Sequence, residues 1–496
     1  MDKTQFSNKK ICLGTEGKKG VVVIGAGPAG VLATRQMKND FDLLTLEAKS
    51  DLGGIWNREY DPSSKTNYEK LYGTSPIEIY KGLYTNNTKQ TVTFKDFPHT
   101  TERLFPYGVE YLDYMKRYAD HFGLRDKMQF NTLVKRLRLI ENLTDEEMKE
   151  FSLSEEDKKY KYVIQTTPNK EEEPNCGNQI ILCDLVVCCT GIFNKPYTPD
   201  VKNKEKFEGE QIHSKDYTDM DFLRKKCEGK RVIVVGHFYS ARDIVKHICL
   251  GFDGQPPISV KSIAQLIRSE KYSKYARDAA EANKEMNCVK VHQAFIESFE
   301  GGNKIKLNNG LIEADIIVWA TGFHFYHPFL DSKDNIISVD EESNGKMLYP
   351  LFLQTFSVNQ PSFAKSLMPF TLELGIVNNF ERQVEMIRAV FNGEKNLPSK
   401  EVMLKSIEDD VEYVRSKGYG KERITMDVQG ERDSVTLGDK WQKFTNIKKR
   451  NTELDKMMNR QGKLYGNSFN TGKYYYVPVF KEFEHFEEVE VTSDKY

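Results

Sequence analysis

One short segment constrains the fold of this chain more than any other: a β-branched run that ends in a glycine-rich turn and continues as a helix. Residues 21–24 read V-V-V-I, residues 25–30 read G-A-G-P-A-G, and residues 31–37 have helical composition. Strand, tight turn and helix in this order begin a β-α-β unit. The segment therefore predicts a dinucleotide site near the start of the chain.

Each part of this motif has an expected task. The first glycine permits the tight turn, the second lets the backbone approach a pyrophosphate, and the third allows close packing of helix on strand. A second apolar strand over residues 41–46 ends on an acid about 20 residues beyond the glycines, where a carboxylate binds a ribose 2′-hydroxyl. That acid disfavours a 2′-phosphate, so FAD or NAD fits better than NADP. The predicted contacts are Gly25, Gly27, Pro28, Ala29, Gly30 and Glu47.

A second strand-turn-helix signal begins at residue 231 with R-V-I-V-V-G-H-F-Y-S-A-R-D-I. Gly236, Ser240 and Ala241 sustain the nucleotide pattern, but Phe238 stands where the second glycine is expected. A phenylalanine there would occupy space that a pyrophosphate needs, so either the loop is reshaped or the dinucleotide binds weakly. This is the main irregularity of the sequence.

Cations that follow the second unit are candidates for binding a 2′-phosphate. A strand is predicted over residues 258–263, with Lys261 at its end and Arg268 a few residues beyond. Both side chains could pair with a phosphate. Solvated surface cations are the alternative interpretation.

Composition narrows the classes of function. The 496 residues include 72 Lys and Arg against 73 Asp and Glu, so no excess of charge favours nucleic acid or a membrane surface. The eight cysteines form no C-x-x-C pair, the histidines form no metal-ligand spacing, and no run approaches the roughly 20 apolar residues that span a bilayer. We therefore expect a cytoplasmic protein without a metal site, a nucleic-acid partner or a membrane anchor.

Several further motifs occur in a fixed order along the chain. They are G-G-I-W at 53–56, L-Y-T-N-N-T-K at 83–89, C-T-G at 189–191, F-E-G-E-Q-I-H-S-K-D-Y at 207–217 and W-A-T-G-F at 319–323. Together they resemble the flavin-containing monooxygenases (dimethylaniline monooxygenases), a group of class B flavoprotein monooxygenases. The motif at 207–217 matches the group's identifying pattern F-x-G-x-x-x-H-x-x-x-[YF].

The resemblance implies two cofactors and roles for particular residues. FAD would bind the first glycine loop, with Gly54 and Trp56 near the flavin, and NADPH would bind Gly236, Ser240 and Ala241. Asn86 would sit by the flavin ring as the catalytic residue, with neighbouring Asn87 and a merely turn-forming asparagine as the alternatives. The pairs Thr190-Gly191 and Thr321-Gly322 would be the crossings between domains, and His213 would have a structural or gating role.

The predicted fold is α/β, with two Rossmann-like dinucleotide-binding domains and the NADPH domain inserted into the FAD domain. Residues 1–205 form the first part of the FAD domain, including a charged insertion about 141–176 on a surface hairpin. Residues 206–330 form the NADPH domain. Residues 331–496 complete the FAD domain and add a C-terminal extension that packs on the body.

The predicted reaction uses NADPH and dioxygen to oxygenate soft nucleophiles, amines or sulfides, through a C(4a)-hydroperoxyflavin. The substrate is a small molecule, and a homodimer is left open. The first alternative is a Baeyer-Villiger ketone monooxygenase, although Tyr217 stands where the related motif usually has Trp. The second is an FAD-binding protein with an impaired NADPH site and a non-oxygenating or interaction role, which Phe238 keeps open.

Overall fold

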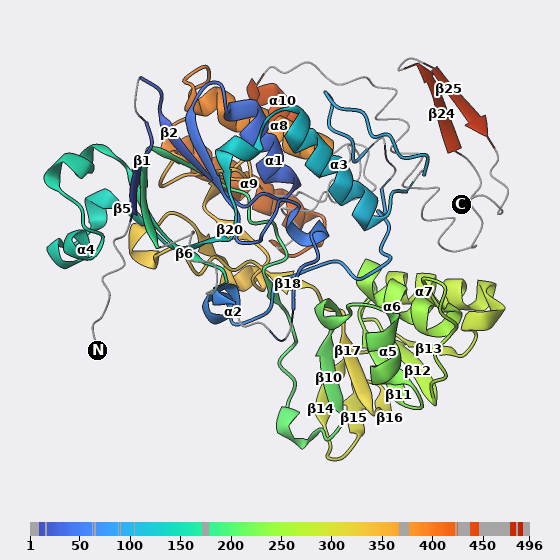
Figure 1. The fold of residues 1–496 in the computed structure, drawn as a ribbon. Coiled ribbons are helices and arrows are strands. Elements are labelled where there is room, and N and C mark those ends of the chain that lie inside the picture. The colour runs from blue at the N-terminus through green and yellow to red at the C-terminus, as the bar shows by residue number, and fades with distance from the viewer. Residues whose placement is uncertain are drawn as a thin grey trace. The chain divides into compact units, whose positions relative to one another are not determined.

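The structure is a computed structural model that describes residues 9–14, 17–61, 63, 66–87, 89, 91–103, 105–170, 178–366, 376–421, 424, 437–445, 477–482 and 485–489. These residues form two compact units (Figure 1). Unit 1 takes its described residues from 1–78, 87–195 and 324–458, and unit 2 from 79–86, 196–323 and 459–496. The predicted insertion of one α/β unit into another is therefore confirmed.

The chain changes units earlier than the predicted borders after residues 205 and 330. It passes into unit 2 at 195/196 and returns at 323/324. The short strands β9 (Lys195–Pro196) and β18 (Phe323–His324) pair with each other there. The two passages thus lie side by side, which a linear reading of the sequence cannot show.

Unit 1 is built on a seven-stranded sheet whose central strands are parallel. Every residue of the central strand β2 is buried, as expected for a parallel strand that is covered on both faces. In spatial order the strands are β21 (Leu351–Phe352), β22 (Phe356–Ser357), β23 (Phe363–Lys365), β8 (Leu185–Cys188), β2 (Gly20–Ile24), β3 (Asp42–Leu46) and β4 (Met128–Gln129).

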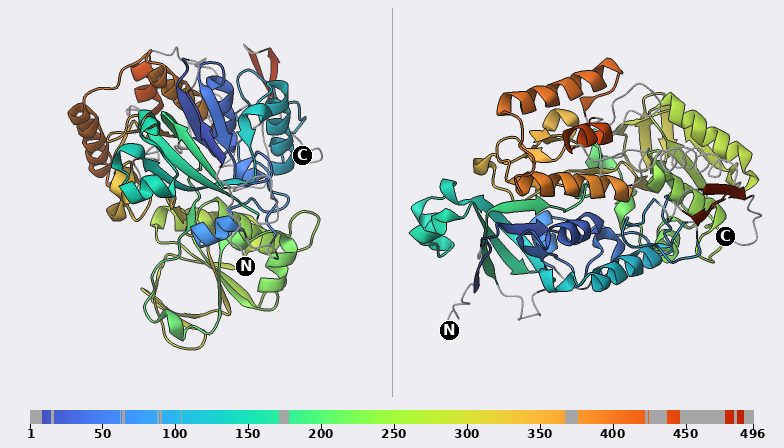
Figure 2. Two further views of the ribbon diagram at one scale, coloured as in Figure 1. Left: turned by 60° about the vertical axis from the view of Figure 1, so that its left-hand side comes forward. Right: turned by 90° about the horizontal axis from the view of Figure 1, so that it is seen from above.

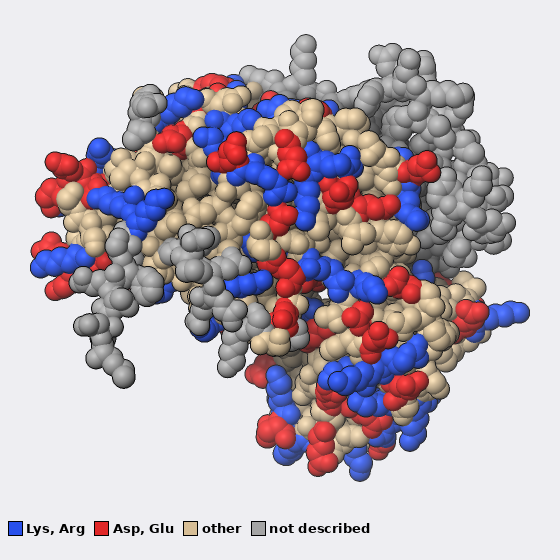
Figure 3. Space-filling view, viewed as in Figure 1, with Lys and Arg blue, Asp and Glu red and all other residues tan. Residues whose placement is uncertain are grey.

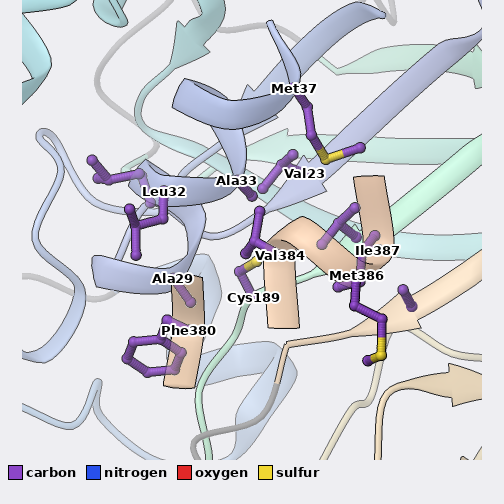
Figure 4. Packing of buried hydrophobic residues seen from close by; sticks show 14 of the residues in the cluster. Val23, Ala29, Leu32, Ala33, Met37, Cys189, Phe380, Val384, Met386 and Ile387 are labelled. Atoms are coloured by element: carbon purple, nitrogen blue, oxygen red, sulfur yellow. The ribbon is translucent and has the colours of Figure 1, made fainter. Parts of the chain in front are cut away.

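Helices cover one face of this sheet. In Figure 4, Ala29, Leu32 and Ala33 of α1 (Pro28–Met37) belong to the same buried cluster as Phe380 and Val384 of α8 (Ile376–Phe391). The two helices lie beside each other in Figures 1 and 2. Small residues on α1 permit this close approach, so the helix that follows the first glycine loop is packed closely against α8. The same cluster takes in α3 (Gly108–His121), α9 (Lys400–Ser416) and α10 (Leu437–Thr445).

A second sheet covers the opposite face. Its order is β1 (Lys9–Cys12), β7 (Gln179–Cys183), β6 (Tyr162–Pro168) and β5 (Thr132–Leu139), and β5, β6 and β7 are antiparallel. The predicted charged insertion thus supplies β6, an interior strand of this sheet, in addition to the exposed charges around α4 (Asp145–Glu150). Arg138 of β5 is fully buried and bonds Asp334 through Nε at 2.8 Å.

Unit 2 is a five-stranded parallel sheet in the order β10 (Glu210–His213), β17 (Ile316–Trp319), β11 (Arg231–Val235), β12 (Ser262–Leu266) and β13 (Val289–His292). Side chains of α5 (Met220–Cys227) and α6 (Tyr239–Leu250) form a core on one face. A small sheet of β14 (Ile296–Phe299), β15 (Lys304–Leu307) and β16 (Gly310–Glu313) packs on the other. The helix α7 (Glu270–Ala282) follows β12.

The remaining described elements are small. They are α2 (Asn67–Tyr72), the pair β19 (Ser338–Val339) and β20 (Leu348–Tyr349), and the hairpin of β24 (Val477–Glu482) and β25 (His485–Val489). Part of the predicted extension does pack on unit 1: Trp441 of α10 is buried and donates Nε1–H to Leu353 O at 2.9 Å.

On the face shown in Figure 3, cationic and anionic side chains are intermixed, in keeping with the near-neutral composition.

Candidate dinucleotide-binding sites

The first glycine loop joins β2 to α1 in unit 1. Gly25 has φ +98°, a region that favours glycine, and a Cβ there would lie 2.8 Å from Cys189 O. A Cβ on Gly30 would lie 1.8 Å from Gly25 O, so the third position admits no side chain. The first and third glycines are therefore required by the protein's own packing.

Gly27 is different because its backbone is ordinary and, among the described residues, only one atom lies near the space that a side chain there would take. It is the N-cap of α1 with φ −70° and ψ −174°, and a Cβ there would meet only Gly54 Cα, at 3.7 Å. The G-G-I-W segment folds against this loop, since Gly53 N–H donates to Ala26 O at 2.9 Å. The result is a cradle of bare backbone next to the first turn of α1, whose N–H groups suit a pyrophosphate.

Glu47 directly follows β3 and closes the cradle on one side. Its carboxylate accepts hydrogen bonds from Ala26 N–H at 2.6 Å and from Lys49 N–H at 2.9 Å. Burial raises the pKa of this carboxyl, and the two backbone N–H donors oppose that rise. Two oxygens offer about four acceptor positions, so capacity remains for ribose hydroxyls.

Lys49 and Trp56 frame the same site. Lys49 is buried and pairs with Glu78 at 2.6 Å, a contact that no pattern in the sequence indicates. Trp56 is partly buried, and its ring meets Tyr111 of α3 edge to face with centroids 4.9 Å apart. The cradle, the acid at its end and the helix start together fit a dinucleotide of the FAD kind.

The second loop, in unit 2, has the same backbone course as the first. Gly236 has φ +133°, and a Cβ there would lie 2.3 Å from Ala320 O. Phe238 is the N-cap of α6 with φ −83° and ψ −173°, close to the values at Gly27. These angles show that the loop is not reshaped. Phe238 is 49% exposed, and its ring meets that of Tyr239 edge to face with centroids 4.5 Å apart.

The structure separates Lys261 from this loop, which corrects the prediction for that residue. The strand lies at 262–266 instead of 258–263, because the segment before it packs under α6, where Ile258 N–H bonds Ile248 O. Lys261 N–H bonds Lys230 O, at the edge of the sheet where β11 begins. Gly236 lies at the other end of β11.

Arg268 lies at the same edge of the sheet as the second glycine loop, where the strands β11 and β12 end. Gly236 N–H donates to Leu266 O at 3.0 Å, and Arg268 follows two residues later. Its side chain is exposed, with the guanidinium 5.3 Å from the centre of the Phe295 ring. Ser240 is exposed in the first turn of α6, while Ala241 is fully buried as a packing residue.

The segment that carries Asn86 belongs to unit 2. The side chain of Asn86 hydrogen-bonds that of Tyr239, the first residue of α6. Tyr80 donates its hydroxyl to Asp243 Oδ2 at 2.8 Å, and Lys81 N–H bonds Thr218 O at 2.7 Å. These contacts fix the segment to the nucleotide helix of unit 2, far along the sequence from residue 86.

Thr321-Gly322 and His213 lie by the passage back into unit 1, whereas Thr190-Gly191 lies within unit 1, ahead of the first passage. Thr321 donates its hydroxyl to Tyr197 O, and Gly322 has φ +84°. His213 is buried, accepts Lys215 N–H at Nδ1 and lies 3.0 Å from Gly322 O through Nε2. Burial lowers the pKa of His213 to about 4, so the ring is neutral near pH 7 and supports a structural role.

Among the described residues no group of three or more His, Cys, Asp or Glu side chains is arranged to hold a metal ion. No helix in that part of the chain is both long and apolar enough to cross a membrane.

Fold and site together define a protein of the two-unit flavoprotein class. The family model described as "Flavin-binding monooxygenase-like" matches residues 18–251 and 280–452, most of the chain. The chain belongs to this family, and is therefore a flavoprotein monooxygenase for which the family implies FAD and NADPH as cofactors.

Individual relatives are similar over most of their length. "Flavin-containing monooxygenase FMO GS-OX-like 3" of Arabidopsis thaliana is 26% identical over 415 residues, covering 81% of this chain and 82% of the relative. "Senecionine N-oxygenase" of Tyria jacobaeae is 27% identical over 410 residues, covering 80% and 77%. The solved S-allyl-L-cysteine S-oxygenase from Allium sativum superposes with TM-score 0.68 at 19% identity, covering 91% of this chain and 92% of that one.

Proposed function

We propose that this protein uses NADPH and dioxygen to oxygenate the nitrogen or sulfur of small amines and sulfides. The observation that carries the proposal is the pair of glycine loops with one backbone course, one in each unit, inside a chain of the flavin-binding monooxygenase family. The printed names of the relatives, an N-oxygenase and an S-oxygenase among them, support soft nucleophiles as substrates.

The chain's own residues would bind and orient the cofactors. In unit 1 the N–H groups at the start of α1 bind the FAD pyrophosphate, Glu47 accepts from the ribose, and Gly27 and Gly54 leave space for close approach. When bound, FAD supplies the electron transfer and oxygen activation that side chains lack.

The second cofactor would be held in unit 2. The start of α6 with Ser240 binds the NADPH pyrophosphate, and Arg268 replaces Lys261 as the partner of its 2′-phosphate. An arginine at the carboxyl edge of the second strand is where such a phosphate is expected. This assignment favours NADPH over NADH.

Asn86 is the proposed catalytic residue. Its side chain is held by Tyr239, so its amide has a fixed orientation before any cofactor binds. A neutral amide can donate a hydrogen bond without adding a charge. In this role Asn86 keeps oxygen transfer coupled to NADPH oxidation.

The experiment offers the purified, FAD-loaded protein a tertiary amine, a thioether and a ketone, and follows NADPH oxidation together with product mass. Oxygen addition to the amine or thioether, with NADH much the poorer donor, is the expected result. Conversion of the ketone alone would establish the Baeyer-Villiger alternative. In Asn86→Ala, NADPH oxidation should persist while hydrogen peroxide replaces the oxygenated product.

Tyr239→Phe is the matched variant, because it removes only the hydroxyl that holds Asn86. It should give intermediate coupling between the wild-type protein and Asn86→Ala. Full coupling in Asn86→Ala would exclude the catalytic role and leave a turn-forming asparagine.

A further inference from the structure

A fully buried lysine ends the strand β23 in unit 1. Lys365 is 0% exposed, and its ammonium donates to Thr190 Oγ1 at 2.9 Å and to Gly191 O at 3.0 Å. Both acceptors are neutral, and no ion pair of Lys365 occurs among the described residues. A lysine is almost never fully buried unless it is paired with an opposite charge, so within the described part of the chain the ammonium has no anionic partner.

His327, which also belongs to unit 1, does not supply that partner. It is 9% exposed, and neither ring nitrogen has a hydrogen-bond partner among the described residues. Burial lowers the pKa of His327 well below its ordinary value, and the charge of Lys365 lowers it further, so the ring is neutral. Buried polar atoms without a protein partner leave a place where a bound water or a ligand group can form a hydrogen bond.

Lys365 stands in register with the dinucleotide site. It pairs with Cys188 of β8, and Cys188 pairs with Ile24 of β2, the residue just before the glycine loop. The carboxyl ends of four adjacent parallel strands therefore present, in spatial order, Glu47, the Gly25 loop, Thr190 and Lys365. Ligands of open α/β sheets bind along this edge.

The order of groups in FAD matches this order of residues. The adenosine ribose is assigned to Glu47 and the pyrophosphate to the Gly25 loop, so the ribityl chain and the ring remain for the β8 and β23 end of the edge. Reduction by hydride transfer adds two electrons and one proton to the neutral ring. If no second proton follows, the ring keeps one negative charge.

We propose that Lys365 is the counter-charge for the ring end of bound FAD and that it stabilises the reduced, negatively charged cofactor over the oxidised, neutral one. The inference rests on FAD binding by unit 1 and not on the identity of the oxygenated substrate. It makes Lys365 a cofactor-binding residue that sets how readily NADPH reduces the flavin.

The test measures the two-electron reduction potential of FAD in the full-length Lys365→Met protein, by equilibration with a reference dye in the absence of oxygen. Reduction should become at least about tenfold less favourable, which lowers the potential by about 30 mV for a two-electron couple. An unchanged potential would overturn the proposal. So would an equal loss of affinity for oxidised and reduced FAD, because it would assign Lys365 to the phosphate or ribityl group.

Three further variants separate charge from packing. Lys365→Arg keeps the charge and should keep the potential near that of the wild-type protein. Ser366→Ala changes the next residue of the chain, which bonds Gln383 at 3.1 Å, and should leave the potential unchanged because no charge is removed. If Lys365→Met does not fold, Lys365→Gln retains a donor for Thr190 and must show the same fall. Since none of these measurements uses a substrate, a failed oxygenation assay would not affect them.

Discussion

Phe238 and Gly27 occupy the same place in two loops and differ only in whether a side chain is present. Their dihedral angles agree to within about 15°, and neither lies in the region that requires glycine. Phe238 is half exposed, with its ring against that of Tyr239. The backbone at this position therefore accepts either residue. A glycine would serve here only to leave space for the ligand.

Phe238→Gly should change the dissociation constant of NADPH by no more than about threefold, under about 1 kcal/mol. The reason is that the loop already has the course of a dinucleotide loop, and a half-exposed ring can turn toward solvent when NADPH binds, so it does not keep the space that the pyrophosphate needs. NADPH binding to the FAD-loaded protein can be followed by titration calorimetry. Tightening by tenfold or more would show that the ring obstructs the site.

Gly236→Ala is the contrasting substitution in the same loop. It forces a Cβ to within 2.3 Å of Ala320 O at a φ of +133°. NADPH binding should weaken by more than tenfold while the FAD content of unit 1 stays constant. Loss of FAD as well would mean that the substitution unfolds more than its own loop.

At the scale of single residues, the sequence best predicted the positions where backbone conformation or close packing requires glycine. Gly25, Gly30 and Gly236 stand where packing excludes a side chain, and a pattern of spacing captures that. The direction of the Phe238 side chain and the burial of Lys365 depend on neighbours distant in the sequence. The burial of Lys365 had one signal in the sequence, which is its position in the short strand-like run F-A-K-S at 363–366.

Among the elements, the strand β5 contains a fully buried arginine, Arg138, that is paired with a buried carboxylate. The ion pair of Arg138 with Asp334 joins two fully buried side chains, and Asp334 also accepts Leu139 N–H at 3.0 Å. Removing one partner of a buried pair leaves an uncompensated charge. This pair connects β5 of the second sheet to the chain that follows β18.

Arg138→Met should therefore reduce the free energy of unfolding by about 3–5 kcal/mol. Lys10→Ala is the control, since it removes a partly exposed partner of Asp157 and should cost about 1 kcal/mol or less. Urea unfolding of the two variants measures the difference. Equal effects would show that the buried pair contributes no more than a surface pair.

The helix α6 holds a carboxyl whose titration is displaced. Burial raises the pKa of Asp243 to about 6 from its ordinary value of 3.8, although the Tyr80 hydroxyl opposes the rise. Between these values the folded protein retains a proton that the unfolded chain has released, so stability falls as pH rises through this window. Replacing Asp243 by a residue that does not titrate should therefore increase the stability of the fold most above pH 6.

Asp243→Asn should raise the melting temperature by about 2 °C or more at pH 7 relative to wild type, and by less at pH 4.5. Thermal unfolding at the two pH values measures this. Tyr80→Phe should act in the opposite direction, because it removes the donor that stabilises the carboxylate. A gain for Asp243→Asn that is independent of pH would contradict the assigned titration.

The sequence predicted the elements next to the glycine loops and misplaced β12. Alternating Ile and Val residues before residue 262 have the composition of a strand, but Pro256 and Pro257 precede them and the segment packs under α6. Proline removes a backbone donor, so pairing starts later than the apolar pattern indicates. The misplaced strand end is the reason that Lys261 was a candidate phosphate ligand beside Arg268.

For the whole molecule, the insertion of one nucleotide unit in another could be predicted from motif order. What could not be predicted is that residues 79–86, which precede the insertion by more than a hundred residues, fold with unit 2. Their contacts with α6 are long-range, and local patterns carry no information about them. Asn86 is thereby built into the unit assigned to NADPH.

The central claim is that one chain carries an FAD site in unit 1 and a working NADPH site in unit 2. Titration of the purified protein with NADPH in the absence of oxygen, followed by the visible absorbance of the flavin, tests it most directly. The account predicts a yellow protein that NADPH bleaches. A colourless protein, or a bound flavin that dithionite bleaches and NADPH does not, would contradict it.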